Sequence, residues 1–387
     1  MKLRHLAEVN PSTPGFDQVA PESAVAFMPL EAVWSDARAD WSRSRPIEEV
    51  ASGYARFTVG DVLCPKVTPT FQAGRSAVVP TIPSGVGAAT TEVHVVRARG
   101  DLADPRFIKF RLLASDFLQE GVSRFQGVAG LQRVPAEFLM DLSIRDIPVE
   151  EQRRIADFLD DQVARIDSVR NLREVAQRNL VLALEGYVEE RILAKATFMP
   201  LGRMASLRVS NVDKHIVDGQ IPVRLCNYVD VYRNSRISEV AEFDSGTATS
   251  DQLKRFSLEQ GDVVFTKDSE TSDDIGIPAY VDLAPHSTVL GYHCCLARPI
   301  AIDGSYLYWA LTSRYVRQQF AVHATGVTRL GLKMDALKAV RLPVAQRPLQ
   351  SGLANDFWQR SEQVEALSTL ANKSLRNLEE RKRAVIT

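Results

Sequence analysis

The chain has 387 residues, and its 47 Lys and Arg residues against 48 Asp and Glu residues leave a formal net charge of −1. This length predicts two or three domains, and hydrophobic and charged shares of 45% and 25% are typical of globular proteins rather than disordered ones. The first residues carry no signal-peptide pattern and no stretch approaches about 18 apolar residues, so we expect a cytoplasmic protein that does not span a membrane.

Residues 1–148 mix short apolar runs with helical stretches and with turns rich in proline and glycine, which predicts a globular domain. The apolar run at 93–97 predicts a buried strand, and residues 107–117 have helical spacing. Gly60-Asp61-Val62 opens another apolar run, which ends at Lys66 where a loop with several prolines begins.

Residues 149–198 predict one long helix, because the stretch from Glu151 to Thr197 has no proline and a single glycine, Gly186. Its apolar residues recur at intervals of 3, 4 and 7, the heptad pattern of a helix that packs along a second helix. About 45 helical residues span roughly 65–70 Å. A domain of this size is about 30–35 Å across, so the alternative that the helix lies only on its own domain fits less well.

Residues 199–345 repeat the plan of the first segment, with Gly261-Asp262-Val263 before Lys267 and helical spacing at 306–320, and residues 346–387 predict a second long helix. The apolar stripes of the two helices are natural partners, since neither helix can bury a face alone. The predicted helix–helix seam consists of Ile155, Leu159, Ile166, Val169, Leu180, Leu353, Phe357, Val364, Leu367 and Leu378.

The two halves align when the sequence is shifted against itself, which predicts a tandem duplication. Met1 and Leu3 fall on Met199 and Leu201 at a shift of 198, and residues 60–66 match 261–267 at a shift of 201. At 199, His94 and Arg99 fall on His293 and Arg298, and the shift is again 198 for the triplets that begin at Arg178 and Arg376. We therefore expect a mixed α+β fold with two similar domains joined and spaced by two long helices.

Signatures of catalysis are absent from the sequence. It contains no phosphate-binding G-x-x-x-x-G-K-[ST], no H-E-x-x-H, no G-x-S-x-G and no Asn-Pro-Pro-aromatic motif. Four cysteines include no C-x-x-C pair, and neighbouring strand residues such as His293-Cys294-Cys295 point to opposite faces, so no metal site is expected. We interpret His94 and His293 as core or hydrogen-bonding residues, and Asp61 and Asp262 as turn residues.

The start of the first long helix carries a family resemblance. The sequence from Ile147 to Leu159, IPVEEQRRIADFL, resembles the I-P-x-x-E-Q-x-x-I-A-x-x-L opening of a helix in specificity subunits of Type I restriction-modification systems. Residues 60–71 and 90–95, and residues 261–278 in the second half, resemble patterns of that family's target-recognition domains. The resemblance covers the chain in the family's domain order, but Pro343–Pro348 lacks the Glu-Gln pair at the second helix start.

The resemblance implies a non-catalytic DNA-binding subunit. Each target-recognition domain would bind one half of a split, asymmetric sequence in double-stranded DNA, and the antiparallel helices would fix the spacing. Two methyltransferase subunits would dock on the chain and methylate adenines with S-adenosylmethionine that they bind themselves. Restriction and translocation subunits would use ATP and Mg²⁺, so no cofactor is expected in this chain.

Loops at equivalent places in the two halves hold the candidate DNA-binding residues. Lys66 and Lys267 follow the Gly-Asp-Val runs and could reach a phosphate or a guanine edge, although a solvated loop lysine is an equal alternative. Nearby hydrogen-bonding and basic residues complete the prediction, namely Thr68, Arg75, Arg133, Ser269, Thr271, Thr328, Arg329 and Lys333.

Charge distribution argues against strong DNA binding by the chain alone. Residues 1–148 hold 16 basic and 17 acidic residues, and residues 199–345 hold 16 of each, whereas DNA-binding domains usually have a basic excess. We expect clustered basic residues and partner subunits to supply the attraction, and weak binding by the isolated chain. The alternative is an assembly scaffold that binds proteins and does not read DNA.

Overall fold

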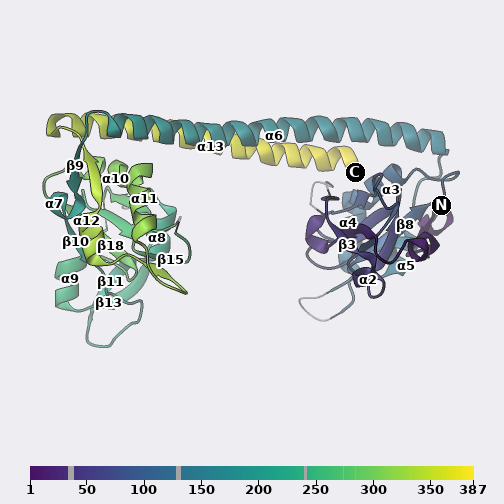
Figure 1. Ribbon diagram of the computed structural model, residues 1–387, viewed down its shortest axis with the longest axis horizontal. Coiled ribbons are helices and arrows are strands. Elements are labelled where there is room, and N and C mark those ends of the chain that lie inside the picture. Colours follow the sequence, from purple (N-terminus) through teal and green to yellow (C-terminus); the bar gives the residue numbers. More distant parts are fainter. Residues whose placement is uncertain (34–38, 128–131, 239–241, 273, 284) are drawn as a thin grey trace. The chain divides into compact units, whose positions relative to one another are not determined.

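The computed structural model describes residues 1–33, 39–127, 132–238, 242–272, 274–283 and 285–387. They divide into two compact units, Met1–Glu174 with Asn372–Thr387, and Val175–Ala371. Each unit contains one globular part and segments of both long helices, α6 (Val149–Leu193) and α13 (Arg347–Ile386), which Figure 1 shows as unbroken. The mixed α+β class and the paired long helices agree with the sequence prediction.

The first unit contains two four-stranded sheets, ordered β1-β8-β5-β6 and β3-β2-β7-β4, in which β2 and β7 are parallel and the other neighbours antiparallel. The predicted strand at 93–97 is β8, and the helical stretch at 107–117 is divided into α3 and α4 by the extended residue Ala114. The elements before α6 are α1 (Leu3–Leu6), β1 (Ala7–Val9), η1 (Pro14–Gln18), β2 (Ala24–Met28), η2 (Leu30–Ala32), β3 (Ser44–Pro46), α2 (Ile47–Val50), β4 (Ala55–Thr58), β5 (Val62–Pro65), β6 (Ala77–Val78), β7 (Val86–Ala89), β8 (Val93–Ala98), α3 (Pro105–Leu113), α4 (Ser115–Ser123) and α5 (Ala136–Asp141).

The second unit has a five-stranded sheet ordered β10-β18-β14-β16-β12, a three-stranded sheet ordered β13-β11-β17, and the strand pairs β15-β19 and β20-β9. The helical stretch at 306–320 is also divided, at Ser313, whose hydroxyl caps the next helix by accepting from the Val316 amide. The elements between α6 and α13 are β9 (Thr197–Pro200), α7 (Leu201–Met204), β10 (Ala205–Val209), β11 (Ile221–Cys226), α8 (Tyr228–Arg233), β12 (Arg236–Ile237), β13 (Asp244–Ala248), α9 (Ser250–Phe256), β14 (Val263–Thr266), β15 (Asp268–Ser269), β16 (Pro278–Val281), β17 (Thr288–Leu290), β18 (Cys294–Pro299), α10 (Gly304–Thr312), α11 (Arg314–His323), β19 (Leu330–Gly331), α12 (Met334–Ala339) and β20 (Arg341–Val344).

Strand pairing corrects the alignment of the two halves around β8 and β18. Val62 pairs with Val96, and its equivalent Val263 pairs with Ala297, so the shift here is 201 and not 199. Arg298 is therefore the counterpart of Arg97 and not of Arg99, and His293 is the counterpart of Glu92 and not of His94. The sequence alignment gave the wrong shift because it matched residue identities across the turn between β8 and α3. This turn differs in length from the equivalent turn between β18 and α10.

The corrected alignment brings out a duplicated ion pair. Arg97 donates to both carboxylate oxygens of Asp61 at 2.8 Å, and Arg298 makes the same pair with Asp262 at 2.9 and 2.8 Å. Asp61 and Asp262 also accept a backbone N–H from the turn before them and are buried. These hydrogen bonds to the carboxylates raise the pKa of both arginines. Both aspartates therefore hold the turn that precedes a central strand.

The long helices pair in opposite directions within each unit. In the first unit, Arg170 donates to Glu379 at 2.6 Å and Lys382 donates to Asp167 at 2.8 Å, so residue numbers rise along one helix as they fall along the other. In the second unit, the Tyr187 hydroxyl donates to Asp356 at 2.8 Å, and the Tyr187 and Phe357 rings meet edge to face. The predicted antiparallel pairing is thus present in both units.

Two of the residues predicted for the helix–helix seam are exposed. Val169 is 40% exposed and Leu367 is 48% exposed, because the partly buried positions beside them are Arg170 and Ser368. Of the other residues predicted for the seam, Leu159, Ile166 and Phe357 are buried, and Ile155, Leu180, Leu353, Val364 and Leu378 are partly buried. Their role in the helix–helix seam stays a prediction.

A buried glutamine fastens each long helix to its globular part. Gln152 accepts the Asp104 amide at 3.2 Å and donates to Leu102 and Ile147 carbonyls, and it is 1% exposed. Gln350, equally buried, accepts the Asp303 amide at 2.8 Å and donates to Ala345. Gln350 lies 198 positions after Gln152, so the second helix start retains this glutamine three residues after Arg347, the position opposite Gln152 when Pro343 is aligned with Pro148.

The contact between globular part and long helix differs chemically in the two units. In the first unit, Arg106 donates to Asp157 at 2.6 Å and Lys109 donates to Asp160 at 2.9 Å, joining α3 to α6. At the positions of Lys109 and Asp160, the second unit has Tyr308 and Trp358, whose rings stack 4.7 Å apart and are buried. An ionic contact in one half thus corresponds to an aromatic contact in the other.

We expect this difference to make the first contact more sensitive to salt. Raising salt from about 0.1 M to about 1 M shortens the Debye length from about 10 Å to about 3 Å and screens the partly exposed ion pairs. Hydrogen exchange in α3 should then accelerate by about three- to fivefold, the loss expected for a surface ion pair. Exchange in α10, beside the Tyr308–Trp358 stack, is the internal control, and equal acceleration in both helices would contradict the prediction.

Candidate nucleic-acid interface

Lys66 lies between two neighbouring segments that hold its backbone. Its N–H donates to the Glu92 carbonyl at 2.9 Å, and its carbonyl accepts from the Val134 amide at 2.9 Å. The next residues continue the contact, since the Thr68 amide donates to the Gln132 carbonyl at 3.0 Å. The loops after β5, before β8 and before α5 therefore meet at Lys66.

Lys267 has the same position in the second unit. Its N–H donates to the His293 carbonyl at 2.8 Å, and its carbonyl accepts from the Leu332 amide at 3.1 Å. The short pair β15–β19 then places Asp268 opposite Gly331 and Ser269 opposite Leu330. The duplication has thus preserved the backbone geometry of three converging loops in both units.

A chain of polar contacts links the loops in the second unit. Asp268 is buried and pairs with the Lys267 ammonium and with His293 Nδ1, the latter at 2.6 Å. The other ring nitrogen of His293, Nε2, lies 3.1 Å from an Arg329 guanidinium nitrogen. Since a guanidinium only donates, Nε2 is the acceptor of the Arg329 contact, and His293 thus links Asp268 to Arg329.

The first unit joins the corresponding loops by one ion pair. Arg133 donates to both oxygens of Glu92, at 2.8 and 2.6 Å, and these hydrogen bonds lower the pKa of the Glu92 carboxyl. Nearby, His94 is buried and hydrogen-bonds to the Val134 carbonyl and to the Asn10 amide, and burial lowers its pKa. The interpretation of His94 as a hydrogen-bonding core residue agrees with these contacts.

The remaining predicted DNA-binding residues differ in exposure. Thr328, Arg329 and Lys333 are exposed beside the Lys267 loops, and Thr271 is exposed with its hydroxyl donating to Asp274 at 3.1 Å. Ser269 is 3% exposed, and its hydroxyl accepts the Thr271 amide, so it shapes the loop from inside. Thr68 and Arg75 are partly buried. Val128, which falls on Val327 when the halves are aligned at a shift of 199, lies outside the described residues.

Glu92 and Asp268 were not among the predicted DNA-binding residues, although they lie in the segments 90–95 and 261–278 that resemble the family's patterns. His293, interpreted from the sequence as a core or hydrogen-bonding residue, hydrogen-bonds to Asp268 and Arg329. At the corrected shift of 201, Glu92 of the first half aligns with His293 of the second. This replacement of one residue type by another between the halves is the sequence signal that could have identified both positions. Arg329 and Arg133, both predicted, are the cations that these residues orient.

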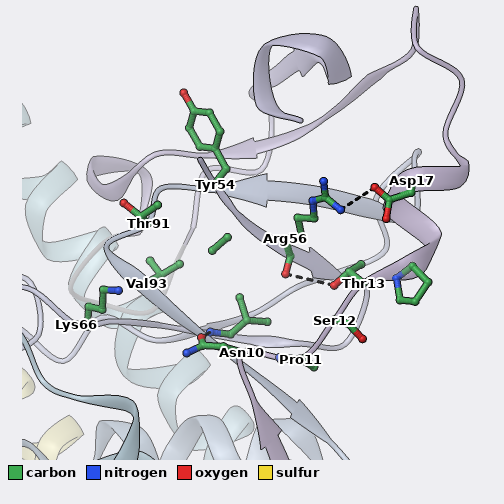
Figure 2. A pocket seen from close by; sticks show the side chains of 13 residues that line it. Asn10, Pro11, Ser12, Thr13, Asp17, Tyr54, Arg56, Lys66, Thr91 and Val93 are labelled. Carbon is green, nitrogen blue, oxygen red and sulfur yellow. Dashed lines mark hydrogen bonds and ion pairs between the residues drawn. The ribbon is translucent and has the colours of Figure 1, made fainter. Parts of the chain in front are cut away.

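A pocket of about 500 Å³ opens beside Lys66 in the first unit (Figure 2). Its wall includes the loop that follows β1, from Asn10 to Pro14, together with Tyr54 and Arg56 on or beside β4. Arg56 donates to Asp17 at 2.7 Å and to the Ala51 carbonyl, so its charge is already paired. The pocket therefore lies between strands of the two sheets, with Lys66 and Thr91 at one side.

Among the described residues, no group of three or more His, Cys, Asp or Glu side chains is placed to hold a metal ion. Burial raises the pKa of the Cys64 and Cys295 thiols to about 12. Within the same part of the chain, no helix has the length and hydrophobicity needed to cross a bilayer.

Comparisons with known proteins agree with the resemblance found in the sequence. No protein-family model matches the chain. It is 31% identical over 156 residues to the Type I restriction enzyme EcoAI specificity subunit of Escherichia coli, covering 40% of this chain and 26% of that protein. The EcoEI specificity subunit of Escherichia coli matches at 31% over 156 residues, with 40% and 25% covered. The match thus spans about a quarter of the length of these curated relatives.

Solved structures extend the similarity to the whole chain. A chain from work on complex assembly and conformational transition of the type I R-M system aligns over 100% of this chain and 95% of its own length, with a TM-score of 0.77 at 16% identity. The HsdS subunit from Thermoanaerobacter tengcongensis aligns over 100% and 94%, with a TM-score of 0.53 at 16% identity. The chain therefore has the fold of Type I restriction-modification specificity subunits, and 40% of its sequence is similar to two curated ones.

Proposed function

We propose that this chain is the DNA-sequence-specificity subunit of a Type I restriction-modification complex. The observation that carries the proposal is the duplication of three loops around one lysine, Lys66 in the first unit and Lys267 in the second. Each loop cluster presents cations and hydrogen-bonding side chains, the groups that contact phosphates and base edges. Two similar clusters in one chain suit a bipartite and asymmetric site in double-stranded DNA.

In this proposal the chain itself catalyses no reaction. The long helices set the spacer between the half-sites and dock two methyltransferase subunits, and those subunits bind S-adenosylmethionine and methylate adenines. Restriction and translocation subunits that use ATP and Mg²⁺ join this complex in the cytoplasm. The balanced charge of the two globular segments supports a shared role, in which partner subunits supply much of the electrostatic attraction for DNA.

The test is to map methylated adenines across the genome of the source cell, with and without the gene for this chain. We expect one split motif with a fixed spacer to lose its methylation on deletion and to regain it when the gene is restored. Unchanged methylation, together with partner subunits that still bind the chain, would contradict the proposal and favour a protein-binding scaffold.

A further inference from the structure

The pocket beside Lys66 contains a cation whose charge the protein does not pair. Among the described residues, the Lys66 ammonium makes no hydrogen bond or ion pair, and Figure 2 shows it directed towards the middle of the pocket. Arg56, on the opposite wall, is held by Asp17. The pocket thus presents one available positive charge within a partly enclosed space.

The carboxylate of Glu92, which interacts with Lys66, is already occupied. Glu92, whose carbonyl holds the Lys66 backbone, gives both carboxylate oxygens to Arg133. Glu92 and Lys66 still attract each other, which contributes to the lowered pKa of Glu92. A ligand that brings its own negative charge to Lys66 therefore does not have to break an ion pair.

The second unit lacks this arrangement at the equivalent lysine. Lys267 pairs with Asp268, and the residue that corresponds to Asp268 in the first unit is Val67, which is buried and uncharged. Both lysines have the same backbone tethers, so the difference lies in the side chain that follows. The Lys267 ammonium is thus paired with a carboxylate, whereas the Lys66 ammonium is available to a ligand.

The other polar groups of the pocket suit an anion that accepts hydrogen bonds. Thr91 places a hydroxyl on the same wall as Lys66, whereas the Asn10 amide, which also lines the pocket, is hydrogen-bonded to His94 and to the Val95 N–H. A volume of about 500 Å³ falls within the range of small-ligand sites, about 300–1,000 Å³.

We propose that this pocket is a phosphate-binding subsite, with Lys66 as the residue that contacts the phosphate. Its ligand is a phosphodiester of the DNA that the first unit binds, so this inference rests on the proposed function. The same chemistry could be supplied by free phosphate, and the experiment separates the two sources. The subsite makes the two units unequal, because the first contributes a direct phosphate contact at a place where the second has an internal ion pair.

The test uses the complete complex with its partner subunits and a duplex that carries the methylated motif. Lys66→Met keeps most of the length of the side chain and removes the charge. We expect its affinity to fall about fivefold for every base sequence alike, and the slope of log K against log salt to flatten by about 0.9. Lys66→Arg should retain most of the slope, and Lys373→Met, which removes an exposed lysine on α13, is the matched control.

Single methylphosphonate replacements along the duplex then locate the contact. Wild type should lose affinity at one position in one half-site, and Lys66→Met should be insensitive at that position. Titration of the chain with inorganic phosphate is the second arm: phosphate binding that requires Lys66, without any sensitive DNA position, supports the subsite but assigns it to free phosphate.

Other results would overturn the subsite. An unchanged salt slope in Lys66→Met with no Lys66-dependent phosphate binding would exclude it, and a loss of preference at one base pair would show that Lys66 contacts a base instead. If the wild-type complex binds no specific DNA, the proposed function fails. The phosphate titration then still decides whether the pocket binds phosphate.

Discussion

Insertion of seven residues into both long helices is expected to lengthen the recognised spacer and to leave the half-site bases unchanged. Seven residues add about 10.5 Å of helix, which corresponds to about three base pairs at 3.4 Å each. They also preserve the heptad phase, so the insertion returns the helix to nearly the same face. The insertions belong after Glu174 in α6 and after Ala371 in α13, the boundaries of the two compact units.

The reason for inserting into both helices is their pairing within each unit. In the first unit Asp167 and Arg170 contact Lys382 and Glu379, and in the second Tyr187 contacts Asp356. An insertion into α6 alone cannot keep both sets of contacts, and this variant should lose function without acquiring a new spacer. It is the control for nonspecific damage.

Methylation mapping in cells that express the doubly extended chain measures the outcome. Three base pairs also turn the second half-site by about 100° around the DNA axis, so we expect reduced methylation at the longer spacer as well as a changed motif. An unchanged spacer in an active complex, or altered half-site bases, would refute the role of the helices in spacing.

Parts of the structure that depend on local patterns could be predicted from the sequence. The absence of proline and the 3-4 spacing from Glu151 onward predict α6, and the apolar run at 93–97 predicts β8. The duplication predicts that Lys66 and Lys267 occupy equivalent loops, and their backbone hydrogen bonds match one for one. These features follow from residues close together in the chain or from direct self-comparison.

Features that depend on contacts between distant segments could not be predicted in this way. The exchange of Lys109 and Asp160 for Tyr308 and Trp358 is visible only when the two halves are aligned with the contacts in hand. Whether each lysine ammonium is paired with a carboxylate likewise depends on the residue that follows it, Asp268 after Lys267 and Val67 after Lys66. For Lys66 it also depends on where Glu92 directs its carboxylate. Local sequence gives residue types, whereas the charge available to a ligand depends on all the neighbours in space.

The buried ion pair between Lys382 and Asp167 should be the most sensitive contact of the helix pair in the first unit. The two Lys382–Asp167 hydrogen bonds measure 2.8 and 3.0 Å, and the side chains are only 8% and 14% exposed. Lys382→Met leaves the Asp167 carboxylate without its main counter-charge in a poorly solvated place. We expect this variant to lose about 3–5 kcal/mol of local stability, the usual cost of removing one partner of a buried pair.

Hydrogen exchange in residues 160–174 is the appropriate measurement, because a chain with two compact units does not guarantee a single two-state unfolding transition. The double variant Asp167→Leu with Lys382→Met removes both charges and should recover most of the loss, since apolar side chains can replace a buried ion pair at little cost. Glu379→Gln, which weakens the more exposed neighbouring pair with Arg170, should cost less than about 1 kcal/mol. If Lys382→Met and Glu379→Gln are equally mild, burial does not govern the strength of these pairs, and the helices are held mainly by their apolar contacts.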